Sequence, residues 1–227
     1  MCNKAWLKGV LRMTEGVILS AMDRLLAATG RALATLNSAV PANRPSPAAD
    51  IHQAEALSES ERKLSGALMR VNHVGEICAQ ALYEGQALSA RDPALKAHFR
   101  DAASEEADHL AWTRQRLDEL GARPSVLNPV WYAGAFAFGV IAGRLGDRAS
   151  LSFMAETERQ VEHHLAGHLD RLPAADLKSR AVLAVMKDDE VAHGQSALRL
   201  GGAEMPAPVG AAMRLAAKVM TNSAHYL

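Results

Sequence analysis

Apolar residues recur every three to four positions along most of this 227-residue chain, and no segment alternates apolar and polar residues as a half-buried strand would. The pattern therefore predicts an all-α protein. Its main elements are four long helices of roughly 25 residues, enough for a helical bundle. We expect them at about residues 58–90, 92–121, 147–172 and 174–200.

Residues that favour helix ends support these limits. Ser58 and Glu61 have the spacing of a capping box, and Asp92-Pro93 reads as an N-cap followed by a first-turn proline. Asp147 is a candidate N-cap for the third long helix. Gly121 is a candidate for the glycine that follows the C-terminal end of the second long helix.

The flanking segments predict shorter amphipathic helices. One runs from about Glu15 to Leu36, and another from Val209 to about Met220. The first has apolar residues at helical spacing: Ile18, Met22, Leu25 and Leu26. Three prolines between residues 37 and 50 then indicate a linker. We therefore expect an N-terminal region at 1–50 and a bundle domain at 51–227. The chain's first 11 residues do not resemble a signal peptide, which favours a cytosolic topology.

Between the two pairs of long helices lie 19 residues without a formal charge, 125–143. A full span needs about 20 apolar residues, and Asn128-Pro129 leaves a shorter helix, so a span is the least favoured interpretation. Two interpretations remain. The segment is either a buried helix of the bundle or a helix that dips into a bilayer surface, with Trp131 and Tyr132 near the headgroups.

Composition narrows the function classes. Lys plus Arg and Asp plus Glu number 25 each, which leaves no basic excess typical of nucleic-acid binding. Cys2 and Cys78 form no Cys-x-x-Cys motif, so a zinc–thiolate site or a disulfide framework is not expected. No Gly-x-Gly-x-x-Gly motif occurs, and a nicotinamide reductant would have to bind without a Rossmann domain.

The sequence contains two Glu-x-x-His steps, each preceded at a similar distance by a glutamate on another expected helix. Residues three apart on a helix share a face, so each step can aim a carboxylate and an imidazole at one point. One such step alone is usually a solvated helix face. Two steps together, each with its upstream glutamate, match the ligand set of di-iron carboxylate bundles. The candidate ligands are Glu76, Glu106, His109, Glu158, Glu190 and His193.

Carboxylates with few imidazoles favour iron or manganese over zinc. We expect Glu106 and Glu190 to bridge two irons, with room left for dioxygen and an organic substrate. Asp108 and Asp189 are candidates for orienting the imidazoles. Four further residues are candidates for supporting the ligands by hydrogen bonds or for contacting the substrate: His73, Tyr83, His163 and His164. The other acidic neighbours are expected to be solvated: Glu105, Glu156, Glu162 and Asp188.

Four segments around these ligands resemble the demethoxyubiquinone hydroxylase family: RVNHVGEICAQALYEGQ (70–86), EEADHL (105–110), ETERQVEHHL (156–165) and DDEVAHG (188–194). The resemblance covers roughly residues 55–227 and includes all six candidate ligands. It implies a ferritin-like fold and a di-iron monooxygenase that hydroxylates a polyprenyl methoxy-methyl benzoquinol with dioxygen in ubiquinone biosynthesis.

The resemblance also implies two iron ions per chain and an external reductant, with NAD(P)H one candidate. It implies peripheral attachment to the cytoplasmic side of the cell membrane, and it allows contact with other ubiquinone-biosynthesis proteins. The uncharged segment fits such attachment. The main alternative is a ferritin-like iron-storage or ferroxidase protein, which would share the ligands but need a cage-forming surface. A tRNA hydroxylase, a di-iron peroxidase and a non-catalytic lipid carrier are further alternatives.

Overall fold

A computed structural model describes residues 21–38, 40–52 and 55–227, and all regular secondary structure within these ranges is helical. The prediction of an all-α protein is confirmed. Contacts divide the chain into two compact units, residues 1–33 and 34–227. The helices are α2 (Ala21–Leu36), α3 (Glu59–Ser89), α4 (Pro93–Glu119), α5 (Asn128–Arg144), α6 (Asp147–Arg171), α7 (Leu177–Arg199) and α8 (Ala207–Tyr226).

The N-terminal predictions are covered only in part. Helix α2 lies within the amphipathic segment expected from the sequence, whereas Ile18 and the first 11 residues lie outside the described residues. The compact unit that holds the bundle begins at Ala34, so it includes the proline-rich segment expected to be a linker. A domain boundary at residue 50 stays a prediction.

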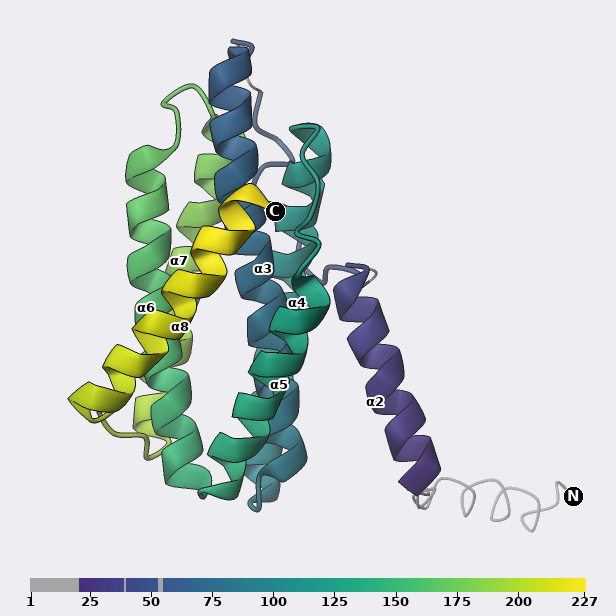
Figure 1. Ribbon diagram of the computed structural model, residues 1–227, viewed down its shortest axis with the longest axis vertical. Coiled ribbons are helices and arrows are strands. Elements are labelled where there is room, and N and C mark those ends of the chain that lie inside the picture. The colour runs from purple at the N-terminus through teal and green to yellow at the C-terminus, as the bar shows by residue number, and fades with distance from the viewer. Residues whose placement is uncertain (1–20, 39, 53–54) are drawn as a thin grey trace, which may run out of the picture. The chain divides into compact units, whose positions relative to one another are not determined.

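The four long helices form the bundle. Helix α3 packs against α4, and α6 packs against α7, with further contacts of α4 with α7 and of α3 with α6 (Figure 1). Helix α5 connects the two pairs and packs along α3, while α8 crosses the bundle obliquely in Figure 1 and contacts α3 and α6. The ligand-bearing segments are thus the four bundle helices, as the sequence predicted.

Most helix limits follow the local chemistry expected of them. Ser58 and Glu61 form the capping box, Asp92 caps α4, and Gly121 has a φ of 66° after the end of α4. Asp147 is not an N-cap. It is the first residue of α6, preceded by Gly146 with a φ of 111°, and its Oδ1 accepts a hydrogen bond from the Arg91 amide.

The start of α7 and the end of α8 also differ from the limits predicted from the sequence. Helix α7 begins at Leu177, later than expected, because Asp176 caps it by accepting a hydrogen bond from the Ser179 amide. Helix α8 extends to Tyr226, beyond the Met220 limit inferred from amphipathic spacing.

Two apolar clusters fill the bundle at different levels. One contains Leu68 of α3, Leu117 of α4 and Leu183 of α7, and the other contains Leu82 of α3, Phe99 of α4 and Met154 of α6. In sequence, the candidate ligands fall between these levels on every bundle helix. The bundle therefore holds a polar layer between two apolar cores.

Helix α5 combines features of both interpretations of the uncharged segment. Tyr132, Gly139 and Gly143 are buried, whereas Val130 and Ile141 are more than half exposed. A Cβ on Gly139 would overlap the carbonyl oxygen of Leu82, so glycine is what allows the backbones of α5 and α3 to approach this closely. None of the described helices is both long and apolar enough to cross a membrane.

The Gly139→Ala variant should be less stable than the wild type, because its methyl group would enter the α3 backbone. We expect overpacking to cost about 1–3 kcal/mol, which lowers the melting temperature by several degrees. Gly134→Ala is the matched control on the same helix, since a Cβ there meets nothing within 4 Å. It should be neutral or slightly stabilising in thermal unfolding followed by circular dichroism. Equal melting temperatures for the two variants would show that the close contact is not as described.

Candidate metal centre

All six candidate ligands lie together in the polar layer, and each is at least nine-tenths buried. Their oxygen and nitrogen atoms form two groups in which potential ligand atoms are within 4.8 Å of one another. The first group contains Glu76, Glu106, His109 and Glu190, and the second contains Glu106, Glu158, Glu190 and His193. Glu106 and Glu190 belong to both groups, which is the arrangement that two bridging carboxylates require.

Nδ1 of each imidazole faces the cluster. In His109 this atom is 3.0 Å from Glu106 Oε2 and 3.5 Å from both Glu76 Oε2 and Glu190 Oε1. In His193 it is 3.2 Å from Glu106 Oε1 and 3.7 Å from Glu190 Oε2. Each helix step therefore presents one carboxylate and one ring nitrogen to a common point, as its spacing predicts.

The outer nitrogen of each imidazole is held by an acidic residue. His109 Nε2 lies 3.0 Å from Asp189 Oδ2, which agrees with the orienting role expected for Asp189. Asp108 does not have that role, because its Oδ1 accepts a hydrogen bond from the Asn43 amide and its Oδ2 accepts one from Arg44 Nε. Glu105 holds His193 instead, with 2.6 Å between Oε2 and Nε2.

Sequence reasoning missed Glu105, which it assigned to a solvated face. Its side chain is 56% exposed, so that expectation describes its environment correctly, but its carboxylate turns back to the imidazole of α7. The position of Glu105 directly before the candidate ligand Glu106 could have indicated that it lies at the edge of the cluster. Adjacent residues point in directions about 100° apart on a helix, so one can face the cluster while the next reaches its edge.

Three buried polar atoms of the cluster make no well-aligned hydrogen bond: Glu106 Oε1, Glu158 Oε1 and His193 Nδ1, although Glu106 Oε1 and His193 Nδ1 are only 3.2 Å apart. Unpaired buried polar atoms are costly, and native structures rarely leave several together. Because all three atoms are good ligands for a hard divalent cation, the donor set fits a pair of metal ions. A zinc–thiolate site does not fit, since no cysteine belongs to either group.

In the metal-free protein, shared protons and opposite charges hold the side chains of the cluster together. Burial raises the pKa of Glu76 and of Glu158 well above the ordinary glutamate range, and nearby carboxylates raise it further. Burial also opposes charge on Glu106, but His109 and His193 outweigh it and lower its pKa. Burial lowers the pKa of His193, but the carboxylates of Glu106, Glu190 and Glu158 outweigh it and raise that pKa to about 12.

The remaining candidate residues lie outside both ligand groups. His73 is buried between Thr113 and Ser38, and burial lowers its pKa to about 4, which makes it a neutral core histidine. Tyr83 belongs to the apolar core, and its hydroxyl has no hydrogen-bond partner. His163 and His164 line a groove beside the cluster. Their roles toward a substrate stay predictions.

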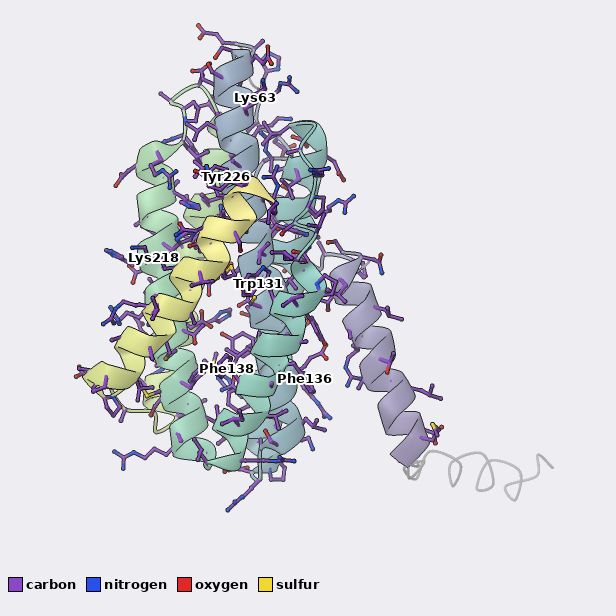
Figure 2. The ribbon with its side chains drawn as sticks, in the orientation of Figure 1. Lys63, Trp131, Phe136, Phe138, Lys218 and Tyr226 are labelled. Atoms are coloured by element: carbon purple, nitrogen blue, oxygen red, sulfur yellow. The ribbon has the colours of Figure 1, made fainter. Side chains whose placement is uncertain are left out.

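This groove has a volume of about 1140 Å³ and lies among α3, α5, α6 and α8. Glu76 forms part of its lining, so the groove reaches the polar layer. Phe138 from α5 and Lys218 from α8, both labelled in Figure 2, contribute to two of its walls. Most of the other lining side chains are apolar, which suits a ligand with a large hydrocarbon part.

A family model described as ubiquinone biosynthesis protein COQ7 matches residues 63–224, which include all six candidate ligands. This chain belongs to the COQ7 family. Curated relatives named 3-demethoxyubiquinol 3-hydroxylase support the same conclusion. The protein from Polaromonas sp. (strain JS666 / ATCC BAA-500) is 61% identical over 207 residues, which cover 91% of this chain and 99% of that protein.

Two further relatives carry the same name. The Variovorax paradoxus (strain S110) protein is 62% identical over 206 residues, covering 91% of this chain and 98% of its own. The Ralstonia pickettii (strain 12J) protein is 55% identical over 214 residues, covering 90% of this chain and 99% of its own. Membership of this family and the buried carboxylate–imidazole cluster together point to a ferritin-like bundle with a di-iron site.

Binding of ferrous iron to the metal-free protein should release protons, and the affinity for iron should rise with pH. The reason is that Glu76, Glu158 and His193 all have raised pKa values, so metal must displace protons that these groups hold near neutrality. Anaerobic iron titrations in weakly buffered solution with a pH indicator measure the release directly. Iron uptake without proton release, and with an affinity independent of pH, would contradict the assigned ligands.

Proposed function

We propose that this protein is a di-iron monooxygenase that hydroxylates the ring of 3-demethoxyubiquinol in ubiquinone biosynthesis. Family membership and the name shared by relatives that are 55–62% identical support the activity. The observation in the structure that supports it most is the buried pair of ligand groups sharing Glu106 and Glu190 beside an apolar groove. In this proposal all six candidate ligands hold two irons.

The reaction inserts one oxygen atom of dioxygen into a ring C–H bond, and the other oxygen atom leaves as water. Two electrons and two protons are needed, and the electrons come from an external reductant, for which NAD(P)H is a candidate. The bound irons would supply the reduction of dioxygen that this chemistry requires. Glu76, Glu106, Glu158 and Glu190 would balance the charge of two divalent ions, which makes their burial tolerable.

The chain's own contribution is to place the quinol ring and to exclude water. Glu76 is the ligand that lines the groove, so the ring would lie against the Glu76 side of the cluster. Val71, Ala79 and Leu82 extend the same α3 wall as apolar contacts. A polyprenyl tail would then follow the groove between α5 and α8.

The alternative of iron storage shares the ligands but does not account for the groove. A storage protein needs a surface that assembles into a shell, whereas an apolar groove that reaches a metal ligand suits an organic substrate. The names of the relatives also describe hydroxylation rather than storage. The hydroxylase is therefore the better-supported function.

We also propose that α5 and α8 bind peripherally to the cytoplasmic surface of the cell membrane. Phe138 and Ile141 on α5 and Leu145 just after it line the groove and are more than half exposed. Leu215 and Val219 on α8 are also more than half exposed, although they do not line the groove. Exposed apolar side chains beside a groove for a lipid substrate would let the quinol enter without crossing water. Contacts with other ubiquinone-biosynthesis proteins stay a prediction.

A strain lacking the gene should accumulate the demethoxy quinone, and the Glu190→Ala variant should fail to restore ubiquinone. Loss of a shared carboxylate removes a ligand from both metal positions, so activity should fall by at least about 100-fold. Asp188→Ala is the matched control on the same helix, because Asp188 is 79% exposed and outside both ligand groups. Lipid extracts analysed by mass spectrometry report both results. Restored ubiquinone with Glu190→Ala would refute the ligand assignment.

The Ile141→Glu/Leu145→Glu double variant should bind less to vesicles that contain anionic lipid. Two charges on the apolar rim oppose burial in the bilayer surface and repel its headgroups. Leu198→Glu is the control, since Leu198 is 47% exposed but lies on α7 and does not line the groove. Co-sedimentation measures the bound fraction. Equal binding by both variants and the wild type would refute attachment through α5.

A further inference from the structure

The segment at residues 43–48, called the strap below, is fastened to the outside of α4 beside the metal cluster. The amides of Asn43 and Arg44 both donate to Asp108 Oδ1, at 2.5 and 3.2 Å. The Arg44 carbonyl accepts from Trp112 Nε1 at 3.3 Å, and the Arg44 guanidinium lies 4.9 Å from the centre of the Trp112 ring. Ala48, only 2% exposed, ends the strap in the apolar core.

The Arg44 side chain spans two carboxylates from different helices. Its Nε donates to Asp108 Oδ2 of α4 at 2.7 Å, and its Nη2 donates to Asp189 Oδ2 of α7 at 2.8 Å. The same Asp189 oxygen lies 3.0 Å from Nε2 of His109. Arg44 Nη2 itself lies 3.5 Å from the same His109 nitrogen, so the guanidinium and the buried imidazole meet around one Asp189 oxygen.

Asp189 needs such support to hold His109 in one orientation. Its side chain is 25% exposed, so water competes for the carboxylate, and a free aspartate samples several rotamers. A planar guanidinium that is anchored on Asp108 fixes the position of the Asp189 oxygen. Asp189 then keeps the His109 ring turned so that Nδ1 points at Glu106 and the ligand group.

The second half of the cluster is built differently. His193 relies on Glu105, whose side chain is 56% exposed, and no ion pair within the described residues joins Glu105 to an arginine or lysine. The two imidazoles thus occupy similar places in the two helix pairs. The acidic partner of His109 is held by an arginine, whereas among the described residues the acidic partner of His193 is not. This asymmetry distinguishes a specific role of Arg44 from a general contribution to folding.

We infer that Arg44 is a positioning residue that, through Asp189 and His109, selectively strengthens metal binding at the Glu76/His109 half of the cluster. The inference rests on the proposed di-iron site. Outer partners of ligating imidazoles typically contribute 10–100-fold to metal affinity. Loss of Arg44 should therefore loosen one metal ion and leave the ion at the Glu158/His193 half largely unaffected.

The test is the rate at which ferrous iron leaves the anaerobically loaded full-length protein to a coloured chelator. Arg44→Ala should release one of two irons about 10–100-fold faster than the wild type, with the second iron unchanged. Glu105→Gln should accelerate the other iron, and the double variant should accelerate both. Asn43→Ala is the matched strap control, because the Asn43 side chain donates hydrogen bonds to Ser104, at 3.4–3.5 Å, and not to Asp108 or Asp189 among the described residues. It should release both irons as the wild type does.

Arg44→Gln provides a second variant if Arg44→Ala is too unstable to load, since it keeps the stem but cannot span the two carboxylates. It should also accelerate one iron only. Faster release of both irons, or of neither, from a folded Arg44 variant would overturn the inference. A wild-type protein that binds two irons without hydroxylating the quinol would refute the proposed function but leave the role of Arg44 standing.

Discussion

The fold is constrained by the burial of four carboxylates and two imidazoles in the middle of a helical bundle. Apolar clusters lie on both sides of this layer, so the charges cannot be solvated by a small movement of one helix. Partly shared protons reduce the cost, but Glu106, Glu158 and His193 still leave buried polar atoms unpaired. Two divalent cations would satisfy these atoms and neutralise the layer, which couples metal binding to the stability of the bundle.

Helices outside the four-helix core adapt this layer to a large organic substrate. Glycines bring α5 close to α3, and α8 crosses α3 and α6, so the groove forms beside the bundle and reaches Glu76. The strap has a different role from the groove. It lies on the outer side of His109 and does not form part of the path to the cluster. One side of the site is thus shaped for access and another for rigidity.

Much of the bundle and the candidate site could be predicted because both depend on local spacing. Ser58 and Asp92 mark helix starts, and a carboxylate three residues before an imidazole must share its face. What failed depends on contacts between distant segments. The Asp147 carboxylate accepts a hydrogen bond from the distant Arg91 amide and does not cap α6, and the partner of His193 proved to be Glu105 of another helix. Nothing local to Arg44 indicates that it spans α4 and α7.

Isotope labelling shows whether the buried cluster uses dioxygen to hydroxylate a quinol ring. Protein loaded anaerobically with two irons is given the demethoxy quinol, a reductant and dioxygen labelled with oxygen-18, and the product is analysed by mass spectrometry. We expect one labelled oxygen atom in each hydroxylated product. Product whose new oxygen comes from water, or no product from protein that holds both irons, would contradict it.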